Sequence, residues 1–309
     1  MEISKFYQQG WKDYPIKQRI KFRIEAFGAY SGFYFLKLLG SKYAPKFCSS
    51  VLSFIGPHLS VSRPMMRNIA RSMPKKRGTE VETIMKGVWH NFGLMIGEFP
   101  FIQDFDTLDN NKVILEGWDE YFINRPNKDK GVIFFSCHTG NWEYISKVAE
   151  DRGVYPYRVF KAPSNPLVLP LFMKRVKAEE EEYLLPANKT AIIKCMRALR
   201  SGNVVALLTD QKTKGGEKVP FFGRIAPTNG FIADLAIKNN VDILPCRTIR
   251  LDDDRLKVIV EPPLQYAKAE DSAHTKMNIL RAMNNKIESW VREYPAQWFW
   301  LHKRWSRKD

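Results

Sequence analysis

Cysteine is scarce in this chain of 309 residues, and its few occurrences are scattered. Cys48, Cys137, Cys195 and Cys246 form no CxxC pair and show no zinc-ligand spacing. Each has mainly apolar or small neighbours, so we expect buried free thiols. Free thiols are typical of a reducing compartment, which for a membrane-bound protein means the cytoplasmic side.

The sequence also lacks a long uncharged apolar run. The two longest candidates cover residues 26–36 and 47–62, and the second contains Pro57, His58 and five serines. A membrane-spanning helix needs roughly 18 or more mostly apolar residues, so both runs are short. Apolar segments of this length flanked by Lys and Arg favour helices that lie in a membrane interface, with a single short span as the alternative. Residues 1–23 contain neither the apolar core nor the cleavage site of a signal peptide.

Acidic residues are rare at both ends of the chain, and this accounts for nearly all of the net charge of +16. Residues 1–78 contain 15 Lys or Arg against 3 Asp or Glu, and residues 297–309 contain four against one. Such basic ends suit nucleic acid, an anionic bilayer or an acidic protein. Nucleic acid is disfavoured, because no helix-turn-helix, RNP or zinc-finger pattern is present.

The hydrophobic pattern divides the chain into a basic helical, membrane-associating region at 1–105 and an α/β domain at 106–309. In the first region, apolar residues recur at helical spacing over 80–99. In the second, short β-branched runs alternate with helical patterns, which predicts a mixed, mostly parallel sheet flanked by helices. We expect strands at 112–118, 131–137, 154–160, 204–210, 242–251 and 255–262, and helices at 141–151, 166–179, 190–200, 228–239 and 271–293.

A polar cluster, HTGNWEY, directly follows the expected strand at 131–137. Histidine is the one side chain whose ordinary pKa lies near neutrality, so His138 is a candidate general base. Glu143 lies five positions on, about 140° around a regular helix. The two side chains can therefore meet only if His138 lies in a turn, which Gly140 permits, and Glu143 reaches back from the first helical turn. A carboxylate there would orient the imidazole; a capping histidine and a surface glutamate are the plain alternative.

Other polar residues occupy strand ends or loops, where substrate contacts are common. Asn141 is a candidate for fixing the turn or for binding substrate. Arg158, at the end of the next strand, is a candidate for contacting an oxyanion or a phosphate. Asp210 and Gln211, at another strand end, could hold Arg158 or close the site. Each also has a purely structural interpretation.

Two further segments have mixed polar and apolar character. Arg224 and Thr228 belong to FFGRIAPT, read as a loop before a helix whose free N–H groups could contact phosphate. The C-terminal QWFWLHKRW suits a membrane headgroup boundary or, as the favoured alternative, a segment that closes the core. The other histidines show no metal-ligand spacing, so we expect no metal and no cofactor. Cys137 is not favoured as a nucleophile, because neighbouring strand residues point to opposite faces.

Five sequence blocks in series resemble the bacterial lipid A biosynthesis acyltransferase family. The resemblance covers roughly residues 85 to 305, and five ordered blocks are far more specific than any one of them. The blocks are HTGNWE (138–143), YRVFKAPSNP (157–166), LLTDQK (207–212), VPFFGRIAPTNGFIADLA (219–236) and YPAQWFWLHKRW (294–305).

The resemblance implies a function and a site. The family's His-four-residues-acid motif falls on His138 and Glu143, and implies transfer of an acyl chain from an acyl carrier protein or coenzyme A thioester. The implied acceptor is a hydroxyl of a lipid A precursor, at the cytoplasmic face of the inner membrane. Many relatives have a clear N-terminal span, which this sequence lacks.

Two other interpretations remain open at this stage. An acyltransferase acting on another glycolipid, such as a phosphatidylinositol mannoside, would fit the same blocks. A non-catalytic lipid-binding relative is less favoured, because His138 and Glu143 are both intact.

Overall fold

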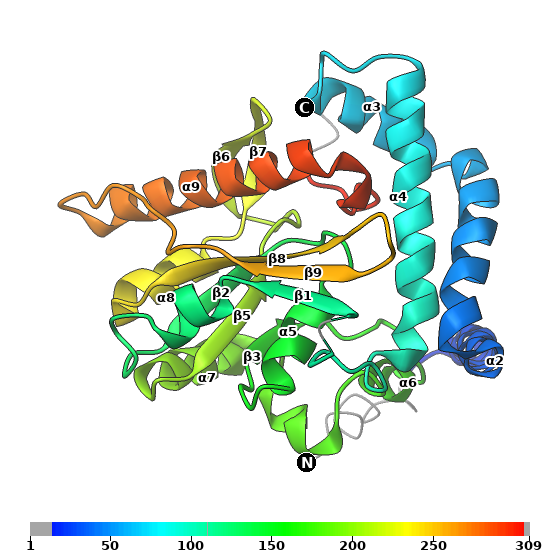
Figure 1. Cartoon of the computed structure of the whole chain (residues 1–309), viewed down its shortest axis with the longest axis horizontal. Coiled ribbons are helices and arrows are strands. Elements are labelled where there is room, and N and C mark those ends of the chain that lie inside the picture. Colours follow the sequence, from blue (N-terminus) through cyan, green and yellow to red (C-terminus); the bar gives the residue numbers. More distant parts are fainter. Residues whose placement is uncertain (1–13, 110, 306–309) are drawn as a thin grey trace.

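A computed structural model describes residues 14–109 and 111–305 of the chain. Within these residues, one sheet has the strand order β1-β9-β8-β2-β5-β3-β4, and all neighbouring strands are parallel except β8 and β9. The predicted mixed, mostly parallel sheet is thus confirmed (Figure 1). Its strands are β1 (Val113–Glu116), β2 (Val132–Ser136), β3 (Tyr157–Phe160), β4 (Leu184–Pro186), β5 (Val204–Leu208), β8 (Ile243–Arg250) and β9 (Leu256–Val260).

Helices cover both faces of the sheet because its central strand is apolar on both sides. Along β2, Ile133 and Phe135 pack in one hydrophobic cluster while Val132 and Phe134 pack in another. The first cluster includes residues of α7, α8 and α9, and the second includes residues of α5 and the π-helix η4. These helices are η4 (Trp118–Ile123), α5 (Glu143–Glu150), α7 (Lys189–Arg200), α8 (Phe231–Asn239) and α9 (Ser272–Glu293), followed by η6 (Pro295–Gln297).

The structure differs from the sequence prediction in two segments. The stretch predicted as a loop, FFGRIAPT (221–228), belongs to an antiparallel hairpin of β6 (Glu217–Phe221) and β7 (Arg224–Thr228). Its two-residue turn has positive φ at Phe222 and Gly223, as type I′ hairpin turns require. The helix expected at 166–179 is only α6 (Leu169–Met173), followed by the 3₁₀ helix η5 (Ala178–Tyr183).

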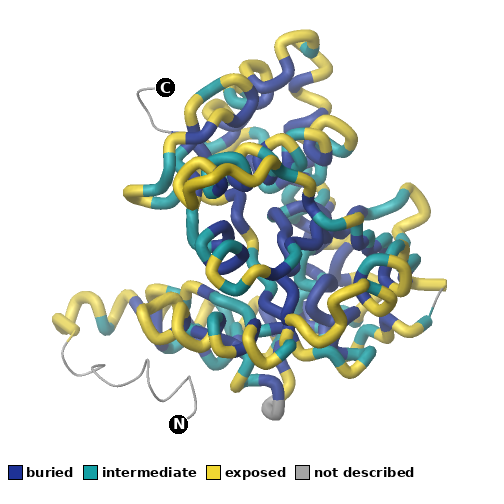
Figure 2. Tube along the Cα trace, turned by 90° about the vertical axis from the view of Figure 1, so that its left-hand side faces the viewer, coloured by how far each residue is buried: buried dark blue, intermediate teal, exposed yellow. Residues whose placement is uncertain are grey.

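Helices α2 (Ile16–Ile55), α3 (Ser62–Ser72) and α4 (Thr79–Glu98) precede the sheet, with the 3₁₀ turns η2 (Gly56–His58) and η3 (Phe99–Phe101). Gly40 has φ 77° and breaks α2; we call residues 16–39 the arm. Figure 2 shows the arm as a largely exposed segment that extends from the body of the molecule. None of the described helices combines the length and apolar character that crossing a bilayer requires. Residues 1–13 of the region predicted at 1–105 lie outside the described residues, and its division from 106–309 stays a prediction.

Helix α4 approaches the second segment of α2 very closely through two glycines. A Cβ atom at Gly93 would lie 2.4 Å from the Ser49 backbone, and one at Gly97 would lie 2.4 Å from Pro45 Cα. Both neighbours are backbone atoms, which cannot rotate away. The glycines at i and i+4 therefore set the contact distance between the two helices.

We expect Gly97→Ala to destabilise the protein by about 1–3 kcal/mol, because the added methyl group overpacks a backbone contact. Gly32→Ala is the matched control, since a Cβ atom there meets nothing within 4 Å. In the control, the higher helix propensity of alanine should stabilise the helix by about 0.5–1 kcal/mol. Urea unfolding measures both changes, and equal midpoints for the two variants would contradict the proposed contact.

Candidate functional site

The pairing of β2 with β5 brings His138 and Asp210 together. The two strands are parallel neighbours, with Ser136 opposite Leu208. His138 and Asp210 each lie two residues beyond this pair, at the carboxyl ends of the strands. The His138 Nδ1 and Asp210 Oδ1 atoms are 2.6 Å apart. A histidine and a carboxylate that are 72 residues apart in sequence thus form one hydrogen-bonded pair.

Asp210 is fully buried and accepts hydrogen bonds from three groups. Besides the His138 ring, the His138 backbone N–H donates to Oδ2 at 2.9 Å and Trp298 Nε1 donates to it at 2.7 Å. Burial alone would raise the pKa of Asp210, but the charge and hydrogen bonds of His138 outweigh it and hold this pKa well below its ordinary value. The residue is therefore a carboxylate throughout the physiological pH range.

The state of the His138 ring follows from this partner. A carboxylate can only accept, so Nδ1 carries the proton and Nε2 has a free lone pair. Gln211 Nε2 lies 3.2 Å from this atom and donates to it. Gln211 is exposed, so an incoming hydroxyl group can replace it. His138 is thus oriented as a base, with its reactive nitrogen on the accessible side.

A second histidine, His302, borders the same pair. Its ring centroid is 5.7 Å from that of His138, and its Nε2 donates to the Asp210 carbonyl oxygen at 3.1 Å. Burial lowers the pKa of His302 to about 4, against the attraction of Asp210. His302 is therefore neutral near pH 7 and adds no charge that would compete for Asp210.

The C-terminal segment holds the turn that carries His138. Thr139 and Trp298 form an isolated β-bridge, and the Phe299 N–H donates to the His138 carbonyl at 2.8 Å. Gly140 has φ 56°, and a Cβ atom there would lie 2.4 Å from the Thr248 carbonyl oxygen. The favoured alternative for QWFWLHKRW, a core-closing segment, fits these contacts, because Trp298, Trp300 and Trp305 are all buried.

Asn141 is fully buried and its contacts lie within the protein. Its Nδ2 donates to Glu98 Oε2 at 2.8 Å, and its Oδ1 accepts from the Glu143 N–H at 3.3 Å. Glu98 in turn pairs with Arg250. Of the two roles considered from the sequence, these contacts match fixing the turn.

Glu143 does not take the position that the sequence analysis gave it. Its carboxylate forms an ion pair with Arg175, whereas the His138 Nδ1 is occupied by Asp210. The physical reason is a stronger local partner: the side chain of Arg175 is 9% exposed and needs a counter-charge. The geometric expectation that Glu143 orients the imidazole is therefore wrong in this structure, and its catalytic role stays a prediction.

The sequence analysis suggests that Asp210 and Gln211 could hold Arg158, but neither residue is its partner in the structure. Arg158 pairs with Glu150 of α5 at 2.6 Å, and both side chains are largely buried. Burial, reinforced by neighbouring Glu180, raises the pKa of Glu150 to about 7 although Arg158 opposes this. Arg158 thus belongs to a buried cluster of charged residues with Glu150 and Glu180, and its contact with substrate stays a prediction.

The hairpin residues singled out from the sequence face the protein interior. Thr228 is fully buried and accepts from Arg304 at 2.8 Å. Arg224 lies over the Trp305 ring at 3.7 Å and donates to Ser72 of α3 at 3.1 Å. Both residues connect the hairpin to its neighbours, and the structure does not bring them to His138 through any contact among the described residues.

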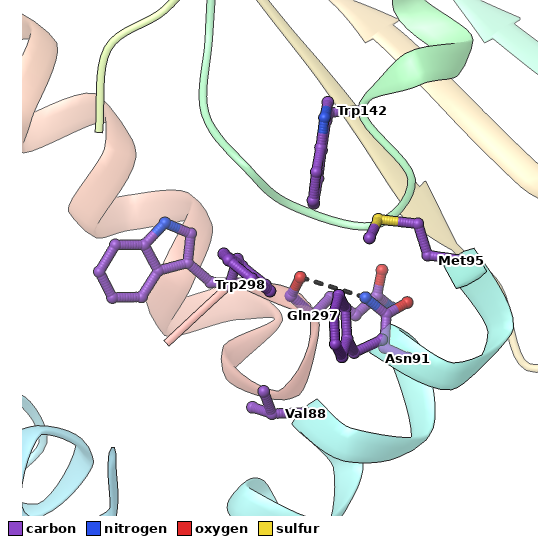
Figure 3. Close-up of a pocket in the computed structure, with 8 residues that line it drawn as sticks. Val88, Asn91, Met95, Trp142, Gln297 and Trp298 are labelled. Carbon is purple, nitrogen blue, oxygen red and sulfur yellow. Dashed lines mark hydrogen bonds between the residues drawn. The ribbon is translucent and has the colours of Figure 1, made fainter. Parts of the chain in front are cut away.

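A narrow recess, with no enclosed space for a water molecule, lies beside the His138 turn (Figure 3); we call it the pocket. The His138 ring is 4.6 Å from that of Trp142 and 6.3 Å from that of Phe299, and both of these aromatic residues line the pocket. Its wall combines residues of α4 with the turn before α5 and the C-terminal segment. The other residues that line it are Val88, Asn91, Phe92, Met95, Gln297 and Trp298.

His138, Asp210 and His302 also form a group of potential metal ligands within 4.8 Å of one another. Two ligand atoms of one tetrahedral zinc ion lie about 3.3 Å apart, since each is about 2.0–2.1 Å from the metal. The 2.6 Å between His138 and Asp210 is instead a hydrogen-bond distance. The arrangement thus fits a hydrogen-bonded base better than a metal centre.

Three contributors to the site were not identified from the sequence as such. The sequence indicates Asp210 as a candidate site residue but not as the partner of His138, although both residues follow apolar strands. The sequence did not single out Trp298 or Arg175. Other aromatic residues lie beside Trp298, and other basic residues lie beside Arg175. Knowledge of strand order would have identified the first, since it places the ends of β2 and β5 side by side.

Comparison with known proteins supplies the family. A profile described as bacterial lipid A biosynthesis acyltransferase matches residues 19–307. A comparison with curated proteins found no match. The profile spans nearly the whole chain, including the strand ends, the hairpin and the C-terminal segment that build the site. The chain therefore belongs to the bacterial lipid A biosynthesis acyltransferase family.

Proposed function

We propose that this acyltransferase moves a fatty acyl chain from the thioester of an acyl carrier protein or coenzyme A to a hydroxyl of a lipid A precursor, in lipopolysaccharide biosynthesis. The family indicates lipid A acyltransferase activity in general. The observation that carries the finer proposal is the His138–Asp210 pair beside an apolar pocket. A base next to an apolar wall suits a hydroxyl on a lipid and a thioester with a hydrocarbon tail.

The proposed reaction uses His138 as both base and acid. His138 Nε2 takes the proton of the acceptor hydroxyl while the oxygen attacks the thioester carbonyl carbon. The tetrahedral intermediate then collapses, the C–S bond breaks, and the imidazolium returns its proton to the departing thiolate. Asp210 stabilises the imidazolium between these two steps, because its carboxylate already accepts from Nδ1. The new ester and the free thiol balance the reaction.

The ion pair of Glu143 with Arg175 is assigned a positioning role in this scheme. Glu143 begins α5, and its partner Arg175 follows α6 and lies over the Phe172 ring at 4.0 Å. The pair connects the turn that carries His138 to the segment after β3. Its loss should disturb the placement of that turn rather than the basicity of His138.

We also propose that the protein lies on the cytoplasmic face of the inner membrane, with the arm of α2 in the interface. Ile20, Ile24, Phe27 and Leu38 are each at least 52% exposed and recur at helical spacing. The opposite side of the arm packs on the protein, where Phe33 contacts Phe99. Exposed basic residues Lys17, Lys21, Arg23 and Lys37 accompany the apolar stripe, as is typical of helices at anionic bilayers.

The first test replaces the proposed base. We expect His138→Ala to fold and to bind vesicles normally, but to lose acyl transfer by at least about 100-fold, because base catalysis typically contributes about 10²–10⁴-fold. Mass spectrometry of a tetra-acylated precursor, incubated with acyl carrier proteins of several chain lengths, measures the product. Near-normal turnover of the variant would rule out general-base catalysis by His138. No added mass with the wild-type protein and any donor would favour a different glycolipid acceptor.

The second test distinguishes the two carboxylates. We expect Asp210→Asn to lower kcat by about 10²–10⁴-fold. It should also move the ascending limb of kcat/KM to lower pH, because the imidazolium loses its counter-charge. Glu143→Gln should leave that limb in place, and its effect should not add to that of Arg175→Gln in a double-mutant cycle. A shift of the limb in Glu143→Gln but not in Asp210→Asn would indicate that Glu143, and not Asp210, orients the His138 imidazole.

The third test concerns the arm. We expect the double variant Phe27→Glu, Leu38→Glu to reduce sedimentation with phosphatidylglycerol vesicles by at least about tenfold, since each buried apolar side chain contributes about 1.5–3 kcal/mol. The matched control, Ile192→Glu with Ile225→Glu, places the same charges at residues that are 44% and 46% exposed outside α2. Equal vesicle binding by the two double variants would refute attachment through the arm.

A further inference from the structure

Helix α3 carries a row of arginines on its outer face. Arg63, Arg67 and Arg71 recur at every fourth position and are all exposed. At the 1.5 Å rise of a helix, the row is about 12 Å long. The inner face of α3 is buried through Ser62, Met65, Ile69 and Ser72.

The row is not neutralised by acidic neighbours in sequence. Residues 62–78 contain no Asp or Glu, and Lys75 and Arg77 extend the basic surface toward α4. Glu80, the first acidic residue after this stretch, pairs with Lys76 at 3.0 Å. Among the described residues, Arg63 and Arg67 have no ion-pair partner within 4 Å. Like charges at i and i+4 cost a helix roughly 0.2–0.5 kcal/mol per pair, so the spacing of Arg63 and Arg67 destabilises α3 slightly.

Helix α3, which carries the row, contacts elements that build the proposed active site. Arg224 of the hairpin donates to Ser72 of α3 and stacks on Trp305, which joins α3 to the C-terminal segment. Helix α3 also packs against α4. The pocket residue Val88 lies nine residues into α4, which is about 14 Å along the helix axis.

The arm lies at the other end of α4, which disfavours a bilayer as the occupant of this row. Phe33 of the arm contacts Phe99, just beyond the last residue of α4, and Lys37 pairs with Asp104 at 2.7 Å. With 20 residues, α4 is about 30 Å long. Figure 1 shows α3 at one end of α4 and the start of α2 near the other. The field of a bilayer at the arm is screened within about 8–10 Å.

We propose that the arginine row of α3 is the docking surface for an acidic helix of the acyl carrier protein that delivers the thioester. This inference rests on the proposed function and adds its donor surface. The guanidinium groups of Arg63 and Arg67, one helical turn apart on the same face, complement carboxylates along one face of a partner helix. The thioester, carried on the flexible prosthetic group of the carrier, would then approach His138 while the protein part stays on α3.

The test reverses the charge of two residues in the row. We expect Arg63→Glu with Arg67→Glu to raise the KM for acyl carrier protein by at least about tenfold at low salt, because rim charges govern encounter and register. The difference from wild type should shrink at high salt. Turnover of a small uncharged donor, an acyl-N-acetylcysteamine thioester, should stay within about twofold of wild type, which also shows that the variant folds.

The matched control is Lys194→Glu with Arg197→Glu, the same charge change on exposed residues of α7. It should leave the KM for the carrier protein near the wild-type value. An equal rise of the KM in the control would show that net charge, and not the position of the row, causes the effect, and would overturn the proposal. A raised KM for the lipid acceptor, with the carrier KM unchanged, would assign the row to acceptor phosphates and also overturn it. Absence of turnover by wild type with every donor would instead refute the proposed function.

Discussion

The site depends on a single buried carboxylate. Asp210 has no exposed surface, and an ionised group in that position is tolerated only when donors surround it. Its donors come from the His138 turn and from Trp298. Each of these groups is itself fixed by the bridge between Thr139 and Trp298. The C-terminal segment therefore helps to stabilise the buried charge of Asp210, because its Trp298 donates a hydrogen bond as well as packing in the core.

The sequence pattern singled out His138 as the candidate base but paired it with Glu143, whereas the structure pairs it with Asp210. Both His138 and Asp210 were recognised at strand ends, because apolar runs followed by polar residues are a local pattern. Their partnership depends on β5 lying beside β2, although β3 and β4 intervene in the sequence. Strand order is decided by long-range packing, which no window of residues contains. Glu143 was the nearest acid in sequence, but Arg175 holds it.

Elements with a strong local sequence pattern were predicted well, whereas elements that depend on long-range contacts were not. The strand at 131–137 is a continuous apolar run and the helix at 271–293 is long, and both occur close to the expected bounds. The hairpin was not predicted, and each of its strands contains a proline (Pro220 and Pro227), a residue that is unusual within strands. It is stabilised from outside, since Arg304 donates to Pro227 and Thr228. The sequence of the hairpin itself does not indicate this contact, because Arg304 lies far along the chain, among the last described residues.

Helix α4 connects the features on which the proposals depend. Its two glycines hold it against the second segment of α2 at backbone contact distance, so the two helices cannot slide without a clash. One end of α4 meets the arm, its middle lines the pocket, and its beginning packs against α3. The proposed function takes one substrate from a bilayer and another from solution, and therefore requires that these approaches be kept apart. A rigid helix of about 30 Å provides that separation, because it exceeds the distance over which a charged membrane acts on a protein surface.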